Sequence, residues 1–189
     1  TYNLSVDYEG LYGASIPKIT DWTLDEFKIN DFGNGIHQLY DEYLHGLAFG
    51  ENESLWASGQ FCSPWGSGTV QSCSMTHGSV SNTTEYQKDG LVMHRNSLGT
   101  WANQFVFGTE KMDSANAIIP ISESEAYVAG YYCHGAVTAD QCSMSMGSQN
   151  FSSETGSGMI FKADYDGNLS WFVDVTSTKK STIHDVAIN

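Results

Sequence analysis

The stretch that decides the fold is LWASGQFC at residues 55–62, because it returns as AYVAGYYC at residues 126–133. Further landmarks return at nearly the same distance. The pairs that mark the period are Cys62 and Cys133, Cys73 and Cys142, and Trp101 and Trp171, which lie 71, 69 and 70 residues apart. Self-similarity at a fixed period indicates one structural unit used more than once. The architecture is therefore that of a repeat of about 70 residues.

The second copy of the unit has the pattern of short strands joined by turns, with almost no helix signal. The predicted strands are residues 126–132, 158–163, 169–175 and 183–188. Asp166-Gly167 predicts a tight turn between two of them, since glycine tolerates a positive φ. Four short strands separated by turns predict one antiparallel sheet, so the expected fold class is all-β.

The period also predicts how the chain is divided. We expect a partial, divergent first repeat at 1–44, a repeat with the Cys62/Cys73 loop at 45–112, a repeat with the Cys133/Cys142 loop at 113–182, and the start of a further repeat at 183–189. Trp101 and Trp171 are expected at equivalent strand starts, where large aromatic residues usually pack in a core.

Three segments of the second repeat carry a family resemblance. They are Tyr-Val-Ala-Gly at 127–130, GMIFKADYDGNLSW at 158–171 and Asp-Val-Ala-Ile at 185–188. Together they resemble the repeats of bacterial-type β-propeller proteins. The resemblance implies propeller-like, four-stranded antiparallel blades, and it implies a fold rather than an activity. The Cys-bounded loop after the Tyr-Val-Ala-Gly strand departs from the family pattern.

The length of the chain implies an incomplete ring. A closed propeller has about 4–8 blades, which at this period needs on the order of 280–560 residues. The sequence has 189 residues, so we expect a segment of a longer polypeptide, or a ring closed between chains. The alternative architecture is a β-sandwich of two or three such sheets.

Charge and hydropathy exclude two classes of partner. The chain has 8 Lys and Arg residues against 22 Asp and Glu residues, and its net charge is −14. This charge repels phosphate backbones, so no nucleic acid is expected as a partner. No stretch approaches the ~18 consecutive apolar residues of a membrane span, so no membrane insertion is expected.

All four cysteines lie at repeated positions. An even number in matched loops favours one local disulfide in each unit. The predicted pairs are Cys62–Cys73 and Cys133–Cys142. Zinc and free thiols are the alternatives, but the neighbouring His77 and His134 are not at equivalent positions. A duplicated metal site would duplicate its ligands, so disulfides are favoured over zinc.

Five Asn-x-Ser/Thr sequons suggest N-linked glycans. Their asparagines are Asn3, Asn52, Asn82, Asn150 and Asn168. Asn82 and Asn150 fall at nearly the same place in the two units. Sequons and disulfides together predict a secreted, extracellular glycoprotein.

Candidate chemistry is sparse. Asp164, Asp166 and Asn168 alternate as oxygen ligands do in calcium loops. The same residues are those that a β-hairpin turn requires, and a hairpin is the favoured interpretation. No cofactor is expected, although calcium is a possible ligand. No His-Glu-x-x-His or Gly-x-Ser-x-Gly motif is present, so we assign no catalytic residue and expect no enzyme.

The sequence is therefore interpreted as a non-catalytic structural or adhesive repeat protein of an extracellular surface or filament. Its expected partners are other protein chains or copies of itself. One alternative is a carbohydrate- or ligand-binding module, with Trp65, Tyr131 and Tyr132 as the candidate contacts, since aromatic rings stack on sugars. The other alternative is a fragment of a propeller hydrolase.

Overall fold

The structure is a computed structural model that describes residues 40–64, 73–77, 80–84, 88–135 and 142–188. These residues form twelve β-strands and one short 3₁₀ helix, η2 (Glu51–Glu53). Every strand pair among them is antiparallel. The prediction of an all-β chain is confirmed. Most of the predicted first repeat, residues 1–39, lies outside the described residues.

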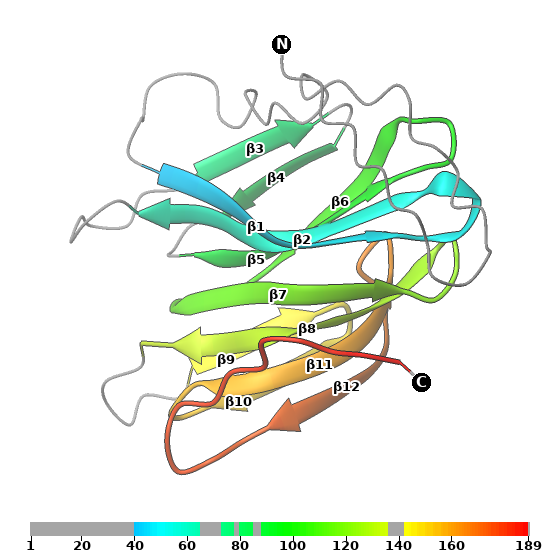
Figure 1. Cartoon of the computed structure of the whole chain (residues 1–189). Helices are drawn as coiled ribbons and strands as arrows, with labels where there is room; N and C mark the ends of the chain where they lie inside the picture. The colour runs from blue at the N-terminus through cyan, green and yellow to red at the C-terminus, as the bar shows by residue number, and fades with distance from the viewer. Residues whose placement is uncertain (1–39, 65–72, 78–79, 85–87, 136–141, 189) are drawn as a thin grey trace.

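The first sheet has four strands in the order β1-β2-β5-β6. Its strands are β1 (Tyr40–Phe49), β2 (Leu55–Pro64), β5 (Asp89–Arg95) and β6 (Trp101–Phe107). A separate two-stranded hairpin is inserted between β2 and β5. It consists of β3 (Cys73–His77) and β4 (Val80–Thr84). The sheet is thus a simple meander with one insertion (Figure 1). The repeat boundary expected at residue 45 falls inside β1.

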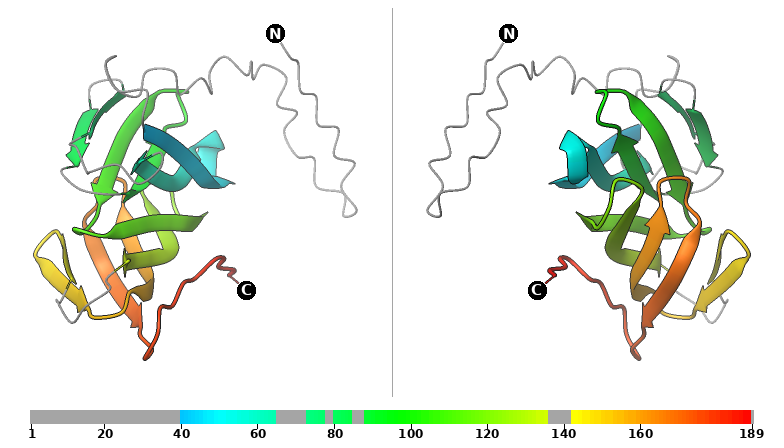
Figure 2. Two further views of the ribbon diagram at one scale, coloured as in Figure 1. Left: turned by 90° about the vertical axis from the view of Figure 1, so that its left-hand side faces the viewer. Right: turned by 90° about the vertical axis from the view of Figure 1, so that its right-hand side faces the viewer.

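The second sheet repeats this plan in the order β7-β8-β11-β12. Its strands are β7 (Met112–Pro120), β8 (Glu125–His134), β11 (Ser157–Asp164) and β12 (Leu169–Val175). The inserted hairpin consists of β9 (Cys142–Met146) and β10 (Gln149–Ser153). The two sheets lie one over the other, and β7 contacts the strands of the first sheet (Figures 1 and 2).

The two units share their irregularities as well as their strands. The β1–β2 pairing shifts register between Leu44 and Gly46, and the β7–β8 pairing shifts at the equivalent place, between Ala115 and Ala117. At the end of β2 and of β8, Cys62 and Cys133 both adopt left-handed backbone, with φ of 63° and 60°. Few non-glycine residues adopt this conformation, so the backbone itself is duplicated.

Equivalent positions follow from strand pairing. Residues of β1 and β2 correspond to residues 71 positions later in β7 and β8, as Gly46–Ser58 and Ala117–Ala129 show. Residues of β5 and β6 correspond to residues 68 positions later in β11 and β12, because the second inserted hairpin is shorter.

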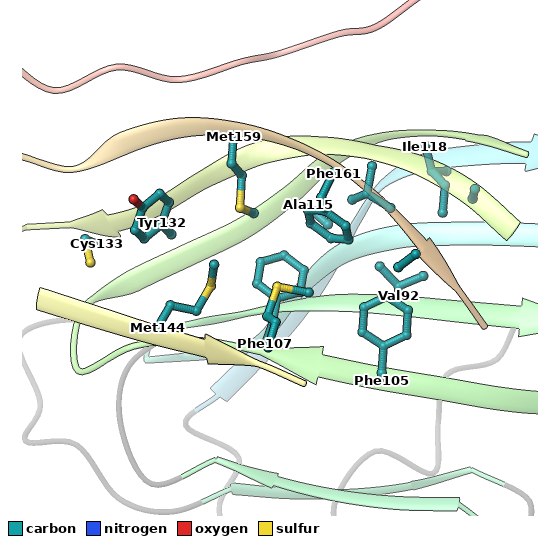
Figure 3. Close-up of a cluster of buried hydrophobic side chains, with 14 of the residues drawn as sticks. Val92, Phe105, Phe107, Ala115, Ile118, Tyr132, Cys133, Met144, Met159 and Phe161 are labelled. Atoms are coloured by element: carbon teal, nitrogen blue, oxygen red, sulfur yellow. The ribbon is translucent and has the colours of Figure 1, made fainter. Parts of the chain in front are cut away.

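The main core lies between the two sheets. Val92, Phe105 and Phe107 of the first sheet pack against Met159 and Phe161 of the second (Figure 3). The rings of Phe107 and Phe161 meet edge to face, with centroids 5.3 Å apart. Burial of a side chain of this size contributes about 1.5–3 kcal/mol. Sheet-on-sheet packing therefore holds the two repeats together.

The predicted fourth strand, 183–188, is not a strand in this structure. The fourth strand of the second sheet is β7, which precedes β8. Residues 183–188 instead run as an extended segment along the second sheet (Figure 1). The second sheet already has its four strands, and within the described residues this segment has no neighbouring strand with which to form a ladder.

Trp101 and Trp171 are not equivalent, contrary to the expectation. Trp101 pairs with Arg95, beside a register shift, and Trp171 pairs with Lys162, which corresponds to His94. Trp101 packs on the first sheet's own small core, whereas Trp171 is exposed and contacts the ring of Tyr127. The irregular pairing places the two rings on opposite faces of their sheets.

Candidate functional site

A disulfide fastens the inserted hairpin of the second sheet to the strand that it leaves. Cys133 in β8 and Cys142 in β9 are bonded, with Cα atoms 5.7 Å apart. This confirms the predicted Cys133–Cys142 pair. Cys62 is also in a disulfide, but the side chain of Cys73 lies outside the described residues. The Cys62–Cys73 pairing therefore remains a prediction.

Asp113 is a buried carboxylate at the base of this hairpin. One of its oxygens accepts a hydrogen bond from the backbone N–H of Cys133 at 2.8 Å, and the other accepts one from the N–H of Thr109 at 2.7 Å. The Thr109 hydroxyl also lies within hydrogen-bond distance of the carboxylate. Burial raises the pKa of Asp113 well above its usual value. The side chain is enclosed, so it acts on the fold: it joins the start of β7 to the hairpin.

A second polar chain links both sheets to the C-terminal segment. Gln60 Nε2 in β2 donates to the Tyr131 hydroxyl in β8 at 2.8 Å. The Tyr131 ring stacks on His134, with centroids 3.8 Å apart. His134 Nε2 lies 2.7 Å from the backbone oxygen of Ser181, to which it donates as the Nε2–H tautomer. Three parts of the molecule are thus tied by one row of side chains.

The structure does not bring the ligand-binding candidates together. Tyr131 and Tyr132 are neighbours on β8 and therefore point to opposite faces of the sheet. Tyr132 is fully buried, and its hydroxyl lies 3.0 Å from Asp174 Oδ2. It offers no surface to a sugar in this structure. Tyr131 is half-buried and engaged with Gln60, and Trp65 lies outside the described residues.

The weak calcium candidate is the turn between β11 and β12. The Asp164 carboxylate accepts hydrogen bonds from the backbone N–H of Asp166 at 3.0 Å and of Asn168 at 2.9 Å. The Asn168 side-chain amide also donates to it. Gly167 supplies the left-handed residue, with φ of 84°. These contacts form a hairpin turn of the Asx type.

The equivalent turn between β5 and β6 has the same geometry without the carboxylate. Asn96 Oδ1 accepts from the N–H groups of Leu98 and Thr100, and Gly99 has φ of 83°. An uncharged side chain thus supports the same turn, so the turn needs no cation. Among the described residues, no group of three or more His, Cys, Asp or Glu side chains is placed to hold a metal ion.

The sequons differ in the position of their asparagines. Asn52 is exposed in η2, and Asn150 is exposed on β10. Asn168 is exposed, but its amide donates to Asp164. Asn82 is the third residue of β4 and Asn150 the second of β10, so the two are one position out of register. The side chain of Asn82, like the whole of Asn3, lies outside the described residues.

His94 is a buried histidine that the sequence did not single out. Its ring lies against Trp56, with centroids 4.6 Å apart, and stacks on Tyr165 at 5.4 Å. Burial lowers its pKa, as it lowers those of His45 and His134. His94 is therefore neutral at pH 7 and serves as a packing group between the sheets.

An exposed apolar row lies on β12, at the outer face of the second sheet. Trp171, Val173 and Val175 alternate along the strand and share this face. Tyr127 on β8 extends the row through its ring contact with Trp171. Contiguous exposed apolar side chains mark surfaces that bind other molecules. The signal was present in the sequence as the alternation of residues 169–175, which the search for reactive motifs passed over.

The described polar groups thus join elements of the fold, whereas the β12 row is open to contact. Among the described residues, no helix is long and apolar enough to cross a membrane. Comparisons of the chain with protein-family models, curated proteins and solved structures give no match. The assignment of function therefore depends on the molecule's own geometry.

Proposed function

We propose that this chain is a propeller-type repeat segment of a secreted, glycosylated structural or adhesive protein, which acts through protein–protein contacts. The observation that carries the proposal is the exposed row of Trp171, Val173 and Val175 on a duplicated, sheet-on-sheet scaffold. Apolar rows of this kind suit a protein surface better than a small polar ligand.

The propeller part of the proposal is supported by the order of the strands. In each unit the four sheet strands follow chain order, and successive units stack face to face. Propeller blades are four-stranded antiparallel sheets repeated in this way. The proposal is an incomplete ring in which these two sheets are neighbouring blades.

The extracellular part is supported by the cysteines and the sequons. The Cys133–Cys142 disulfide is typical of an oxidising compartment. Asn52 and Asn150 are exposed, as a glycan acceptor must be. The non-catalytic part is supported by the enclosure of Asp113 and His94, two side chains with shifted pKa values that lie in packed surroundings.

The test is made on the natural protein. Cell fractionation followed by non-reducing peptide mapping should find it outside the cell, with the Cys133–Cys142 link and with glycans that glycosidase removes from Asn52 and Asn150. Amine cross-linking of the intact surface should join Lys179, next to β12, to other protein chains more often than Lys111. An intracellular protein with four free thiols would contradict the proposal, and so would a surface protein whose Lys179 gains no cross-links.

A further inference from the structure

The two sheets present equivalent positions on equivalent faces, so the packing of the first sheet indicates what can cover the second. In the first sheet Val92 pairs with Phe105 across β5 and β6. The corresponding pair in the second sheet is Ile160 and Val173, across β11 and β12. Both pairs are 68 residues apart in sequence and lie on the face that points toward the following unit.

These equivalent positions differ sharply in exposure. Phe105 and Phe107 are 8% and 3% exposed, because the second sheet covers them. Their counterparts Val173 and Val175 are 47% and 40% exposed. The second sheet therefore shows, uncovered, the face that the first sheet buries against its neighbour.

The segment after β12 approaches the second sheet as β7 approaches the first. The backbone N–H of Asp113, in β7, donates to the carbonyl of Lys88, just before β5. The N–H of Ser181 donates at 3.2 Å to the carbonyl of Gly156, just before β11. Donor and acceptor are each displaced by the same 68 residues. Residues 181–188 therefore occupy the place of a first strand for which the other three strands are missing.

We infer that the outer face of the second sheet is the docking surface for a further four-stranded sheet of the same repeat, whose first strand is the segment 181–188. This rests on the repeat architecture of the proposed function. The incoming sheet must offer apolar side chains of the kind that Val128, Met159 and Phe161 offer to the first sheet. They would cover Val173 and Val175 as those residues cover Phe105 and Phe107.

A second copy of this chain does not fit the same place. It would have to present its first sheet's opposite face, where Ala57, Leu91 and Met93 correspond to Val128, Met159 and Phe161. Those three side chains are already buried, with exposures of 0–3%. The occupant is therefore a further repeat unit and not the exposed surface of another copy.

The experiment extends the whole chain by one repeat. After Asn189, residues 122–189 are added a second time, so that 181–189 can play the part of 113–121. The appended copy carries Val173→Ile, which gives its peptide a distinct mass. Hydroxyl-radical labelling with mass spectrometry then follows the original Val173. We expect its labelling to fall about sixfold, the ratio between the exposures of Val173 and Phe105. Leu98, which is 88% exposed in a distant turn, is the internal control.

Two matched variants of the original copy test the face itself. Val173→Asp should abolish the protection of the Val175 peptide in the extended chain, and Leu98→Asp, with the same change in charge, should preserve it. The proposal is overturned if labelling of Val173 in the extended chain equals that in the parent chain, whether or not the appended residues fold. It is also overturned if the parent chain forms dimers that Val173→Asp dissociates, because the occupant is then a second copy.

This outcome is separable from that of the proposed function. The labelling uses purified protein and does not depend on where the natural protein is found. An intracellular location with free thiols would contradict the proposed function and leave the docking result intact. Unchanged labelling of Val173 would remove the docking surface and leave secretion and glycosylation unaffected.

Discussion

Two valines at opposite ends of the exposure scale provide a direct test of the inter-sheet core. Val92 lies in β5, faces the second sheet and is 1% exposed, whereas Val173 in β12 is 47% exposed. The same substitution to alanine removes the same atoms and the same strand preference at both positions. Any difference between the two losses therefore reports burial.

The magnitudes follow from the surroundings of each side chain. Val→Ala removes two methylene equivalents, worth about 0.8 kcal/mol each when they are fully buried, or about 1.6 kcal/mol. At Val92 the neighbouring Phe105 and the second sheet leave a cavity, which adds roughly 1 kcal/mol. We expect Val92→Ala to lower the free energy of unfolding by about 2–3 kcal/mol. Val173→Ala, with half of its surface already in water and no cavity, should lower it by less than about 1 kcal/mol.

The assay is urea unfolding of the two variants and the parent, with the midpoint and the m-value fitted for each. An unchanged m-value allows the midpoint shift to be read as a change in stability. Equal losses at the two positions, or a larger loss for Val173→Ala, would show that the second sheet does not cover Val92. The stacking of the two repeats would then be wrong.

Three further perturbations test other parts of the structure. Cys142→Ser opens the ten-residue loop closed with Cys133, and should lower the free energy of unfolding by about 2.5–3 kcal/mol in the chain-entropy model, measured by urea unfolding without reductant; an unchanged midpoint would contradict a structural role. Gly130→Ala should cost more than about 3 kcal/mol, because its Cβ would lie 1.9 Å from a carbonyl oxygen of β7, whereas at Gly147→Ala the Cβ meets no atom within 4 Å and only the cost of a positive φ, about 1 kcal/mol, remains; a comparison of thermal midpoints decides. The pKa of His94 is lowered in the folded state, so the unfolded chain takes up the proton first and stability should fall as pH drops below 6.5; His94→Gln should flatten this slope in unfolding measured from pH 7.5 to 5.5, and an identical slope would refute the assignment.

The repeat period was enough to predict an all-β chain, its antiparallel hairpins and the Cys133–Cys142 disulfide. The turn at Asp166-Gly167 could also be predicted, since its chemistry is local. The period could not tell which strand completes a sheet: pairing with β7 rather than with 183–188 is decided by contacts distant in sequence.

The faces of the strands were the other limit. Trp101 and Trp171 match by residue type and by period, yet the shifted pairing next to Arg95 places them on opposite faces. A shift of one residue exchanges the faces of a strand, and no residue in the sequence announces it. Asp113 was missed for a related reason, because its significance depends on the N–H of Cys133, which folding brings to it.

The hairpin β9–β10 separates a fixed root from a variable tip. The Cys133–Cys142 bond holds its root, and Met144 and Met146 seal it onto the inter-sheet core. Residues 147–150 at the tip are exposed (Figure 2, yellow). Changes at the tip therefore need no compensation in the sheets, so each repeat can diversify what it displays while its scaffold stays constant. For an engineer, the same separation makes Gly147 a natural point at which to graft a foreign peptide.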